Sequence, residues 1–343
     1  MGIKKKVLVI GPNFYNFSKA VKHAFEQCGY DVRLEMYDTP IHPYTTSMKW
    51  KYKLSSNKEV LKCKSKKKYQ TYIEHFFDNY IPEIVFILNG DILLHETLDY
   101  FRKRSKVVVW FFDSITRYPS LINHVDHADY TFCYEKTDVD YYSNQNKKAY
   151  FLPQACDITV YKPLKIEDID KDIDILFVGD LYNSKKRQQY INTVVKEFSN
   201  KKIKVFGVYK PWYKNFWKWL FREKRTIYAN HSIPTHLVND YYNHSKVVLN
   251  IHHEQQVYGA NPKVYEISGA GAYQICDMNS YLKKIYPNNE IAFYKNEKEL
   301  IDTIHDVLEN NKWNNSKVAY KIVHSNHTYE NRIKYVLEII NNE

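Results

Sequence analysis

Short apolar runs rich in β-branched residues recur along the first half of the chain, separated by longer stretches with helical periodicity. The first is Lys6–Ile10 (KVLVI), and it is followed by an amphipathic stretch, Ser18–Cys28, that predicts a helix. Further strands are expected at Val32–Met36, Ile84–Leu88, Val107–Phe112, Tyr130–Tyr134 and Ala149–Leu152. Continuous apolar strands that alternate with helices are typical of a parallel sheet covered on both faces.

The same alternation starts again in the second half. Strands are expected at Ile173–Val178, Ile203–Val208, Val247–Ile251, Tyr273–Cys276 and Ile291–Tyr294, and helices at Lys185–Phe198, at Leu237–Asn243 and from Lys298 onward. The polar stretch Asp157–Asp172, which contains Pro163, is the expected linker. We therefore expect an α/β protein with two Rossmann-like, doubly wound domains that face each other across a cleft. The expected boundaries are 1–160 and 161–325, with a C-terminal helix at 326–343 that could pack back toward the N-terminal domain.

Doubly wound sheets bind their ligands beyond the carboxyl ends of the strands. This rule selects a small set of candidate site residues that directly follow the expected strands. They are Gly11 and Asn13, Asp91, Asp113, Gly179, and the loop His252–Asn261. The chain has neither GxGxxG after its first strand nor GxxxxGK[ST], so a nicotinamide oxidoreductase and a P-loop enzyme are both disfavoured.

Positive charge is concentrated in two windows. Lys and Arg number 50 and Asp and Glu 39, which gives a net charge of +11. Residues 49–68 carry nine Lys and one Glu, and residues 210–225 carry six basic residues and one Glu. The net charges of these two windows add up to more than the net charge of the whole chain, so the rest of the chain is slightly acidic. This argues against a nucleic-acid surface along the whole chain. We interpret Lys49–Lys68 as a solvated insertion.

The second basic window, Lys210–Arg225, has the pattern of an amphipathic helix. Tyr213, Phe216, Trp217 and Leu220 would share one face, with Lys and Arg on another. Such a helix suits an anionic membrane surface, although a helix that covers the second domain is the more common explanation. No window approaches 18 uninterrupted apolar residues, so no membrane span is expected.

The five cysteines are widely scattered and form no CxxC pair, so the sequence indicates neither a zinc site nor a disulfide framework. The apolar part of the amino terminus is too short for a signal peptide. We expect a cytoplasmic protein without a bound metal or cofactor.

Three of the nine glycines fall within the stretch GANPKVYEISGAG, at Gly259, Gly269 and Gly271. Pro262 fits the first position of a helix and Asn261 its N-cap. The free N–H groups of such a first turn, with Lys263 beside them, suit a diphosphate. One turn later, the carboxylate of Glu266 could accept hydrogen bonds from the hydroxyls of a ribose. The alternative is an ordinary capped helix with an exposed glutamate.

These segments resemble a known family. The stretch YYNHSKVVLNIHHEQQVYGANPKVYEISGAGAYQICD is similar to the donor-binding region of GT-B glycosyltransferases, above all to the spore-maturation (CgeB-like) group. The resemblance extends to DILFVGDLYNSKKRQQYI, VVWFFDSITRY and HTYENRIKYVLEII. It covers most of the C-terminal half well and the N-terminal half loosely.

The resemblance implies a nucleotide-diphospho-sugar donor, foremost a UDP-sugar, in the C-terminal domain and no obligatory metal. It implies that Glu266 holds the ribose and that Asn261 and Lys263 lie near the diphosphate. Gly179 corresponds to the glycine that ends the first strand of the donor domain, and Arg187 is a candidate second phosphate ligand. Tyr258 departs from the pattern, because many retaining members have a glutamate there.

An inverting transfer also needs a base near the acceptor hydroxyl. Asp113 is the first candidate and Asp91 the second, although each could instead cap a following helix. His252 is a third catalytic candidate, and Gly11 and Asn13 are expected on the acceptor side. A zinc site at His252 and His253 is disfavoured, because adjacent residues of an extended chain point in opposite directions.

The expected function is that of a hexosyltransferase-type enzyme that moves a sugar to a cell-envelope, glycan, lipid-linked or protein acceptor. The expected location is the cytoplasm, with peripheral contact to the inner membrane face through 210–225. The alternative is a non-catalytic two-domain protein that binds a nucleotide-sugar or a polyanion.

Overall fold

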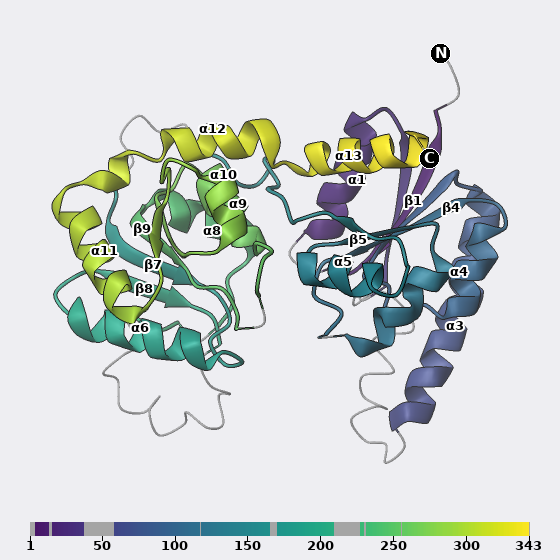
Figure 1. Cartoon of the computed structure of the whole chain (residues 1–343), viewed down its shortest axis with the longest axis horizontal. Helices are drawn as coiled ribbons and strands as arrows, with labels where there is room; N and C mark the ends of the chain where they lie inside the picture. Colours follow the sequence, from purple (N-terminus) through teal and green to yellow (C-terminus); the bar gives the residue numbers. More distant parts are fainter. Residues whose placement is uncertain are drawn as a thin grey trace. The chain divides into compact units, whose positions relative to one another are not determined.

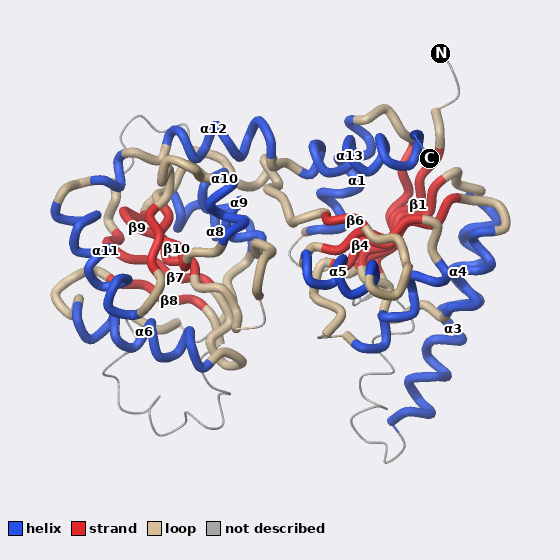
Figure 2. Tube along the Cα trace, viewed as in Figure 1, coloured by secondary structure: helices blue, strands red, loops and turns tan. Residues whose placement is uncertain are grey.

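The chain forms two compact units, each built around one sheet with helices outside it (Figure 2). The computed structural model describes residues 4–13, 16–37, 58–116, 118–164, 170–208, 227–229, 231–254 and 256–342. The first unit comprises Met1–Pro153 and Tyr329–Glu343, and the second comprises Gln154–Thr328. The division lies a few residues before the boundary expected at 160, because the backbone of Cys156 already hydrogen-bonds to the second unit. Its N–H donates to the carbonyl of His327 at 2.9 Å.

All strands of the first unit are parallel and lie in the order β2-β1-β3-β4-β5-β6. Each expected strand is present within one or two residues of its expected bounds. They are β1 (Lys6–Gly11), β2 (Asp31–Met36), β3 (Ile84–Leu88), β4 (Lys106–Phe111), β5 (Tyr130–Cys133) and β6 (Tyr150–Phe151).

Helices cover both faces of this sheet. They are α1 (Phe17–Gln27), α3 (Lys58–Tyr80), α4 (His95–Arg102), the 3-10 helix η1 (Pro119–His127), α5 (Lys136–Ser143) and α13 (Tyr329–Asn342). Since side chains of a strand alternate between faces, Leu8 and Ile10 share a buried cluster with Phe77 of α3. On the opposite face, Phe86 meets Phe25 of α1 with ring centroids 5.2 Å apart. The C-terminal α13 lies beside α1 (Figure 1).

The strands of the second unit are also parallel, in the order β11-β10-β9-β7-β8. They are β7 (Ile173–Val178), β8 (Ile203–Phe206), β9 (Ser245–Asn250), β10 (Gln274–Asp277) and β11 (Ala292–Tyr294). The helices are α6 (Lys185–Glu197), α8 (Thr235–Asn243), α9 (Pro262–Gly269), α10 (Ser280–Ile285), α11 (Glu297–Glu309), η3 (Lys312–Asn314) and α12 (Lys317–Asn326). The strand order reverses between β7 and β9, which is where ligands bind in sheets of this kind.

Two buried clusters flank the second sheet. Phe177 and Leu249 pack with residues of α6 and α11, whereas Leu176 and Val248 pack with residues of α8, α9 and α12. Because both sheets are parallel and covered on both faces, the expectation of two doubly wound, Rossmann-like domains is confirmed.

One glycine pair brings β7 and β8 close together at their carboxyl ends. Gly207 has φ +140°, and a Cβ atom there would lie 1.8 Å from the carbonyl oxygen of Gly179. A side chain at 207 would therefore push apart the ends of these strands. The approach explains why glycine is needed at position 207, directly after β8.

Both basic windows fall partly or wholly outside the described residues. The expected helix at Lys210–Arg225 and residues 49–57 lie outside them. Residues 58–68 form the first half of α3, and their lysines Lys64, Lys67 and Lys68 are exposed, as expected for a solvated segment. That this segment is an insertion stays a prediction. Among the helices that the structure describes, none is long and apolar enough to span a membrane.

Candidate donor site

The first turn of α9 lies at the carboxyl edge of the second sheet. Asn261 is its N-cap, because its side-chain oxygen accepts a hydrogen bond from the N–H of Val264 at 3.2 Å. Pro262 occupies the first helical position. The predicted cap and helix start are therefore confirmed, and the first N–H groups of a helix have no partner within the helix itself.

A buried amide network fixes this helix start to the sheet. The side chains of Asn250 and Asn261 exchange hydrogen bonds of 3.1 and 2.9 Å. Asn250 also donates to Gln274 at 3.0 Å, and Gln274 donates to the carbonyl of Val264. The amide of Asn261 is thus used within the protein, which favours a positioning function for it. Neither Asn250 nor Gln274 was selected from the sequence.

Glu266 is buried, with 6% of its surface exposed, so the alternative of an exposed glutamate is wrong. Burial raises the pKa of its carboxyl group, and the charge of Lys263 and a hydrogen bond from Tyr161 offset part of this effect. Burial lowers the pKa of Lys263, which the negative charge of Glu266 partly offsets. Lys263 and Glu266 thus form a pair of opposite charges within one turn of α9.

A second ionic group lies beside the helix start. His252, 4% exposed, hydrogen-bonds through Nδ1 to Asp277 at 2.5 Å, and its Nε2 lies 3.5 Å from the N–H of Asn261. Lys186 donates to the other carboxylate oxygen of Asp277 at 2.6 Å. Burial alone would raise the pKa of Asp277, but His252 and Lys186 hold it far below its usual range. Neither Asp277 nor Lys186 was selected as a candidate site residue from the sequence.

The side chains of His252, Cys276 and Asp277 also form a group that could hold a metal. Their ligand atoms lie within 4.8 Å of one another, and it is the one such group among the residues that the structure describes. Burial raises the pKa of the Cys276 thiol well above its usual value, so the thiol is protonated at neutral pH. A metal would need both a thiolate and displacement of the Lys186 ammonium.

Arg187 spans the point where the strand order reverses. Its Nε donates to the carbonyl of Ile251 at 2.8 Å, and its NH1 donates to the carbonyl of Asp180 at 3.1 Å. Burial lowers the pKa of this guanidinium, and Asp277 and Asp180 oppose that shift. The side chain therefore joins the loops that follow β7 and β9, beside Gly179.

The remaining residues of the His252–Asn261 loop have local partners. His253 hydrogen-bonds to the carbonyl of Asn183 at 3.0 Å. Glu254 accepts hydrogen bonds from Ser184 and from the N–H of Lys186, both at 2.9 Å, and so fixes the loop to the start of α6. Tyr258 is half-buried, and its hydroxyl accepts a hydrogen bond from Lys284 at 3.0 Å.

In the first unit, the candidate bases lie in loops that follow β3 and β4. Asp91 accepts a hydrogen bond from Tyr37 at 3.0 Å, and Asp113 is half-buried. The capping alternative is wrong for both, because α4 and η1 have Leu94 and Tyr118 at their N-caps. Gly11 ends β1, and Asn13 follows it two residues later.

A buried carboxylate supports the loop after Asp113. Asp138 accepts hydrogen bonds from the Ser114 hydroxyl at 2.9 Å and from the Ile115 N–H at 3.0 Å. Burial raises the pKa of Asp138 to about 6. This contact was not predictable, because Asp138 lies on α5 and no sequence pattern distinguishes it from a solvated aspartate.

Comparisons with known proteins agree with this architecture. Residues 186–338 match the family model described as glycosyl transferase-like. No curated protein matches this chain in sequence. Sucrose-phosphate synthase from Thermosynechococcus elongatus superimposes with a TM-score of 0.70 at 11% identity, and the match covers 99% of both chains.

Two further solved structures show the range of proteins that share the fold. HepE from Anabaena, solved with UDP and glucose, has a TM-score of 0.62 at 10% identity over 99% of this chain and 100% of its own. A UDP-N-acetylglucosamine 2-epimerase from Listeria monocytogenes has a TM-score of 0.60 at 12% identity over 98% of this chain and 96% of its own. These similarities show the two-domain fold of GT-B glycosyltransferases and of such epimerases.

Proposed function

We propose that the protein is a glycosyltransferase that uses a nucleotide-diphospho-sugar, foremost a UDP-sugar, bound at the start of α9. The observation that supports this most is the buried Glu266 one turn behind a capped helix start, with Lys263 beside it. The match of residues 186–338 to a glycosyl transferase-like family model supports a transferase over an epimerase. Similarity to the CgeB-like group remains a prediction.

The roles within the donor site follow from charge and hydrogen bonding. The N–H groups at the start of α9 and the ammonium of Lys263 would bind the diphosphate and stabilise the charge that develops on it. The carboxylate of Glu266 would accept hydrogen bonds from the ribose hydroxyls. Arg187 would add a second cation, while Asn261 keeps the helix start in place. Tyr258 lies where a sugar contact is expected.

The acceptor would bind to the first unit, near Gly11 and Asn13. Asp113 is the proposed base, since its loop is held by Asp138, and Asp91 is the second candidate. No step of this mechanism requires a metal ion, because cationic side chains supply the charge for the leaving diphosphate. A cell-envelope, glycan, lipid-linked or protein acceptor remains the prediction, as does cytoplasmic membrane contact through 210–225.

The direct test measures UDP binding by calorimetry in the wild type, Glu266→Gln and Glu266→Ala. We expect both variants to lose at least about tenfold in affinity, because each removes a charged hydrogen-bond acceptor. Glu309→Gln, at an exposed glutamate of α11, is the matched control and should bind as the wild type does. Unchanged UDP affinity in a folded Glu266→Ala protein would overturn the proposed site.

The alternative of a non-catalytic binding protein requires a separate measurement. A panel of UDP-sugars is incubated with the protein and with candidate acceptors, and the release of UDP is followed. Release that exceeds the blank and disappears in Glu266→Ala supports an enzyme. Tight UDP binding without release from any donor would support the binding protein.

A further inference from the structure

We propose that the first half of α3, residues 58–68, binds the acceptor, and that this acceptor is an anionic glycan, one that carries phosphate or carboxylate groups. The assignment rests on the proposed function, because only a transferase makes a bound glycan an acceptor. Three features of α3 support it. The helix extends past the sheet, the extension carries exposed lysines on one face, and helix stability does not explain their position.

The second half of α3 runs along the first sheet from its carboxyl edge to its amino edge. The last residue of the helix, Tyr80, donates to the carbonyl of Asp31 at the start of β2 at 2.8 Å. About two turns earlier, Tyr72 donates to the carboxylate of Glu35, near the end of β2, at 3.2 Å. The helix is therefore antiparallel to β2, and its earlier residues lie closer to the carboxyl edge.

The first half of α3 begins beside a candidate site residue. The ring of Tyr69 lies 6.4 Å from the ring of Tyr37, which directly follows β2. The Tyr37 hydroxyl donates to Asp91, at the carboxyl edge of the sheet, at 3.0 Å. Residues 58–68 precede this contact, so they extend past that edge by about 16 Å at 1.5 Å per residue. Figure 1 shows the start of α3 extending past the strands of the first unit.

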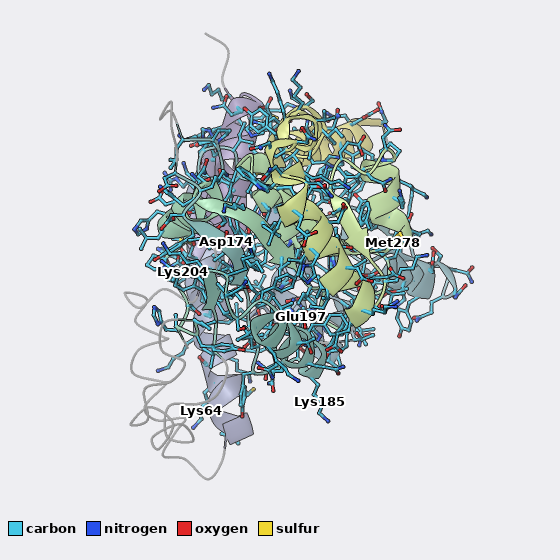
Figure 3. All side chains as sticks on the ribbon, turned by 90° about the vertical axis from the view of Figure 1, so that its left-hand side faces the viewer. Lys64, Asp174, Lys185, Glu197, Lys204 and Met278 are labelled. Atoms are coloured by element: carbon cyan, nitrogen blue, oxygen red, sulfur yellow. The ribbon has the colours of Figure 1, made fainter. Side chains whose placement is uncertain are left out.

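The exposed charge of this extension lies on one face of the helix. Lys64, Lys67 and Lys68 are exposed, and their spacing of three and four residues places them on the same side. Figure 3 shows Lys64 on this part of α3. None of the three forms an ion pair with an acid among the residues that the structure describes. Their ammonium groups are thus open to an anion from outside the protein.

Helix stability does not explain where these lysines lie. The start of a helix carries a partial positive charge and its end a partial negative charge, so cations stabilise a helix in its last turn. The distribution in α3 is the opposite. Residues 58–68 contain six Lys and one Glu, whereas the last turn has no basic residue. An anionic ligand beside the lysines offsets the repulsion among them.

An anionic membrane is the competing partner for such a surface. A helix that lies on a membrane has an apolar face opposite its cations. Among the described side chains of residues 58–68, Val60 is the one large apolar residue that is exposed. A hydrated anionic chain needs no apolar face. The position of the lysines beyond the edge at which these sheets bind ligands also favours the acceptor.

The first measurement uses a reporter on the extension itself. Cys63 is exposed and lies four residues before Lys67, whereas the other four cysteines are buried or half-buried. An environment-sensitive fluorophore on Cys63, in a Cys28→Ser background, is titrated with polygalacturonate, with poly(glycerol phosphate) and with neutral dextran. We expect a saturable response to the two anionic chains and none to dextran. The affinity should fall as NaCl rises from about 50 to 200 mM.

Removal of the three charges provides the comparison. The variant Lys64→Gln/Lys67→Gln/Lys68→Gln should bind the anionic chains at least about fivefold more weakly and with a smaller salt dependence. The matched variant has the same change at three exposed lysines of α11 and α12, which are Lys298, Lys317 and Lys321. It should bind as the wild type does. Equal losses in the two variants, or an equal response to dextran, would overturn the binding surface.

Vesicles separate the glycan from the membrane. The labelled protein is titrated with phosphatidylcholine vesicles that contain phosphatidylglycerol. Tighter binding to these vesicles than to either anionic chain would replace the glycan with a membrane surface. A response to the anionic chains that exceeds the response to the vesicles supports the glycan.

The second measurement tests the acceptor class by turnover. With a UDP-sugar that the donor panel identifies, glycans with and without acidic groups are compared as acceptors. The triple variant of α3 should raise the KM for the anionic acceptor at least about fivefold and leave both kcat and the UDP affinity unchanged. Equal KM values for anionic and neutral glycans, or an unchanged KM in the triple variant, would overturn the acceptor class.

The outcomes distinguish this inference from the proposed function. Absence of UDP binding in the wild type rejects the proposed function and the acceptor role with it, while the Cys63 titration still decides whether α3 binds anionic chains. UDP binding and turnover without any response at Cys63 overturn the inference alone.

Discussion

The side-chain amides of Asn250 and Asn261 exchange two hydrogen bonds, one from the end of β9 and one from the N-cap of α9. Each amide therefore fixes the orientation of the other. A third amide, Gln274 at the start of β10, completes the network. The helix start that we propose for the diphosphate is consequently positioned by two strands of the sheet and not by its own turn alone.

Replacing Asn250 by Ala should weaken both stability and binding. The side-chain amides of Asn261 and Gln274 would each lose their hydrogen bond to Asn250. A buried polar group that loses its partner lowers the free energy of unfolding by about 1–3 kcal/mol. We expect a lower free energy of unfolding in urea titrations and weaker UDP binding by calorimetry. The matched variant is Asn296→Ala at the exposed N-cap of α11, which should lose about 1 kcal/mol and keep its UDP affinity. Equal UDP affinity in the two variants would contradict the positioning role.

Lys263 should distinguish ligands by their phosphates. Lys263→Met is expected to bind UDP at least about tenfold more weakly, UMP less so, and uridine as the wild type does, because only the phosphate contacts lose a charge. Lys263→Arg keeps the charge and should recover part of the affinity. Lys317→Met, at the exposed start of α12, serves as the control. Equal losses for UDP and uridine would show that Lys263 supports the fold and not the phosphates.

Asp113 should affect turnover and not donor binding. With a UDP-sugar that the panel identifies as a substrate, Asp113→Asn is expected to lower kcat by about 10²–10⁴ while the dissociation constant for UDP stays unchanged. Asp91→Asn should have the smaller effect, because Asp113 is the first candidate and its loop is held by Asp138. A greater loss of turnover in Asp91→Asn would exchange the two assignments.

His124 should make the first unit sensitive to acid. Its ring is 2% exposed, its Nε2 hydrogen-bonds to the carbonyl of Gly90 at 3.1 Å, and its Nδ1 lacks a partner among the residues that the structure describes. Burial is the main reason that its pKa is lowered to about 4, with His95 and Lys66 adding to the effect. The folded protein therefore binds this proton less readily than the unfolded chain.

The sign of the effect follows from that difference. The unfolded chain binds the proton below about pH 6.5 and the folded protein only near pH 4, so stability falls as the pH is lowered between these values, by about 3 kcal/mol. Urea titrations at several pH values should show this slope in the wild type and a smaller one in His124→Gln. The exposed His23 provides a control, since His23→Gln should leave the slope as it is.

The local features of this fold were predictable from the sequence. The strands are apolar runs bounded by glycine or polar residues. The start of α9 is marked by two neighbouring residues, Asn261 as the N-cap and Pro262 as the first helical residue. Each of these signals lies within a few neighbouring residues, so no knowledge of distant contacts was needed. The same applies to Glu266, whose place one turn into α9 follows from the helix start.

The contacts that fix the site were not predictable, because they depend on the register of separate strands. Asn250 meets Gln274 and His252 meets Asp277 only because β9 and β10 are paired with Asn250 opposite Cys276. The sequence does carry a partial signal. Asn250 and Asp277 are each the polar residue at the end of an apolar strand, and the rule that selected Asp113 would have selected both.

The second unit is a single uninterrupted stretch of the chain, whereas the first unit needs residues from both sides of it. The C-terminal residues contribute to the core of the first unit, because Ile333, Val336 and Ile340 of α13 are buried. During synthesis from the amino terminus, the second unit therefore has all of its residues before the first unit does. The part of the protein that is translated first is the part whose folding is completed last.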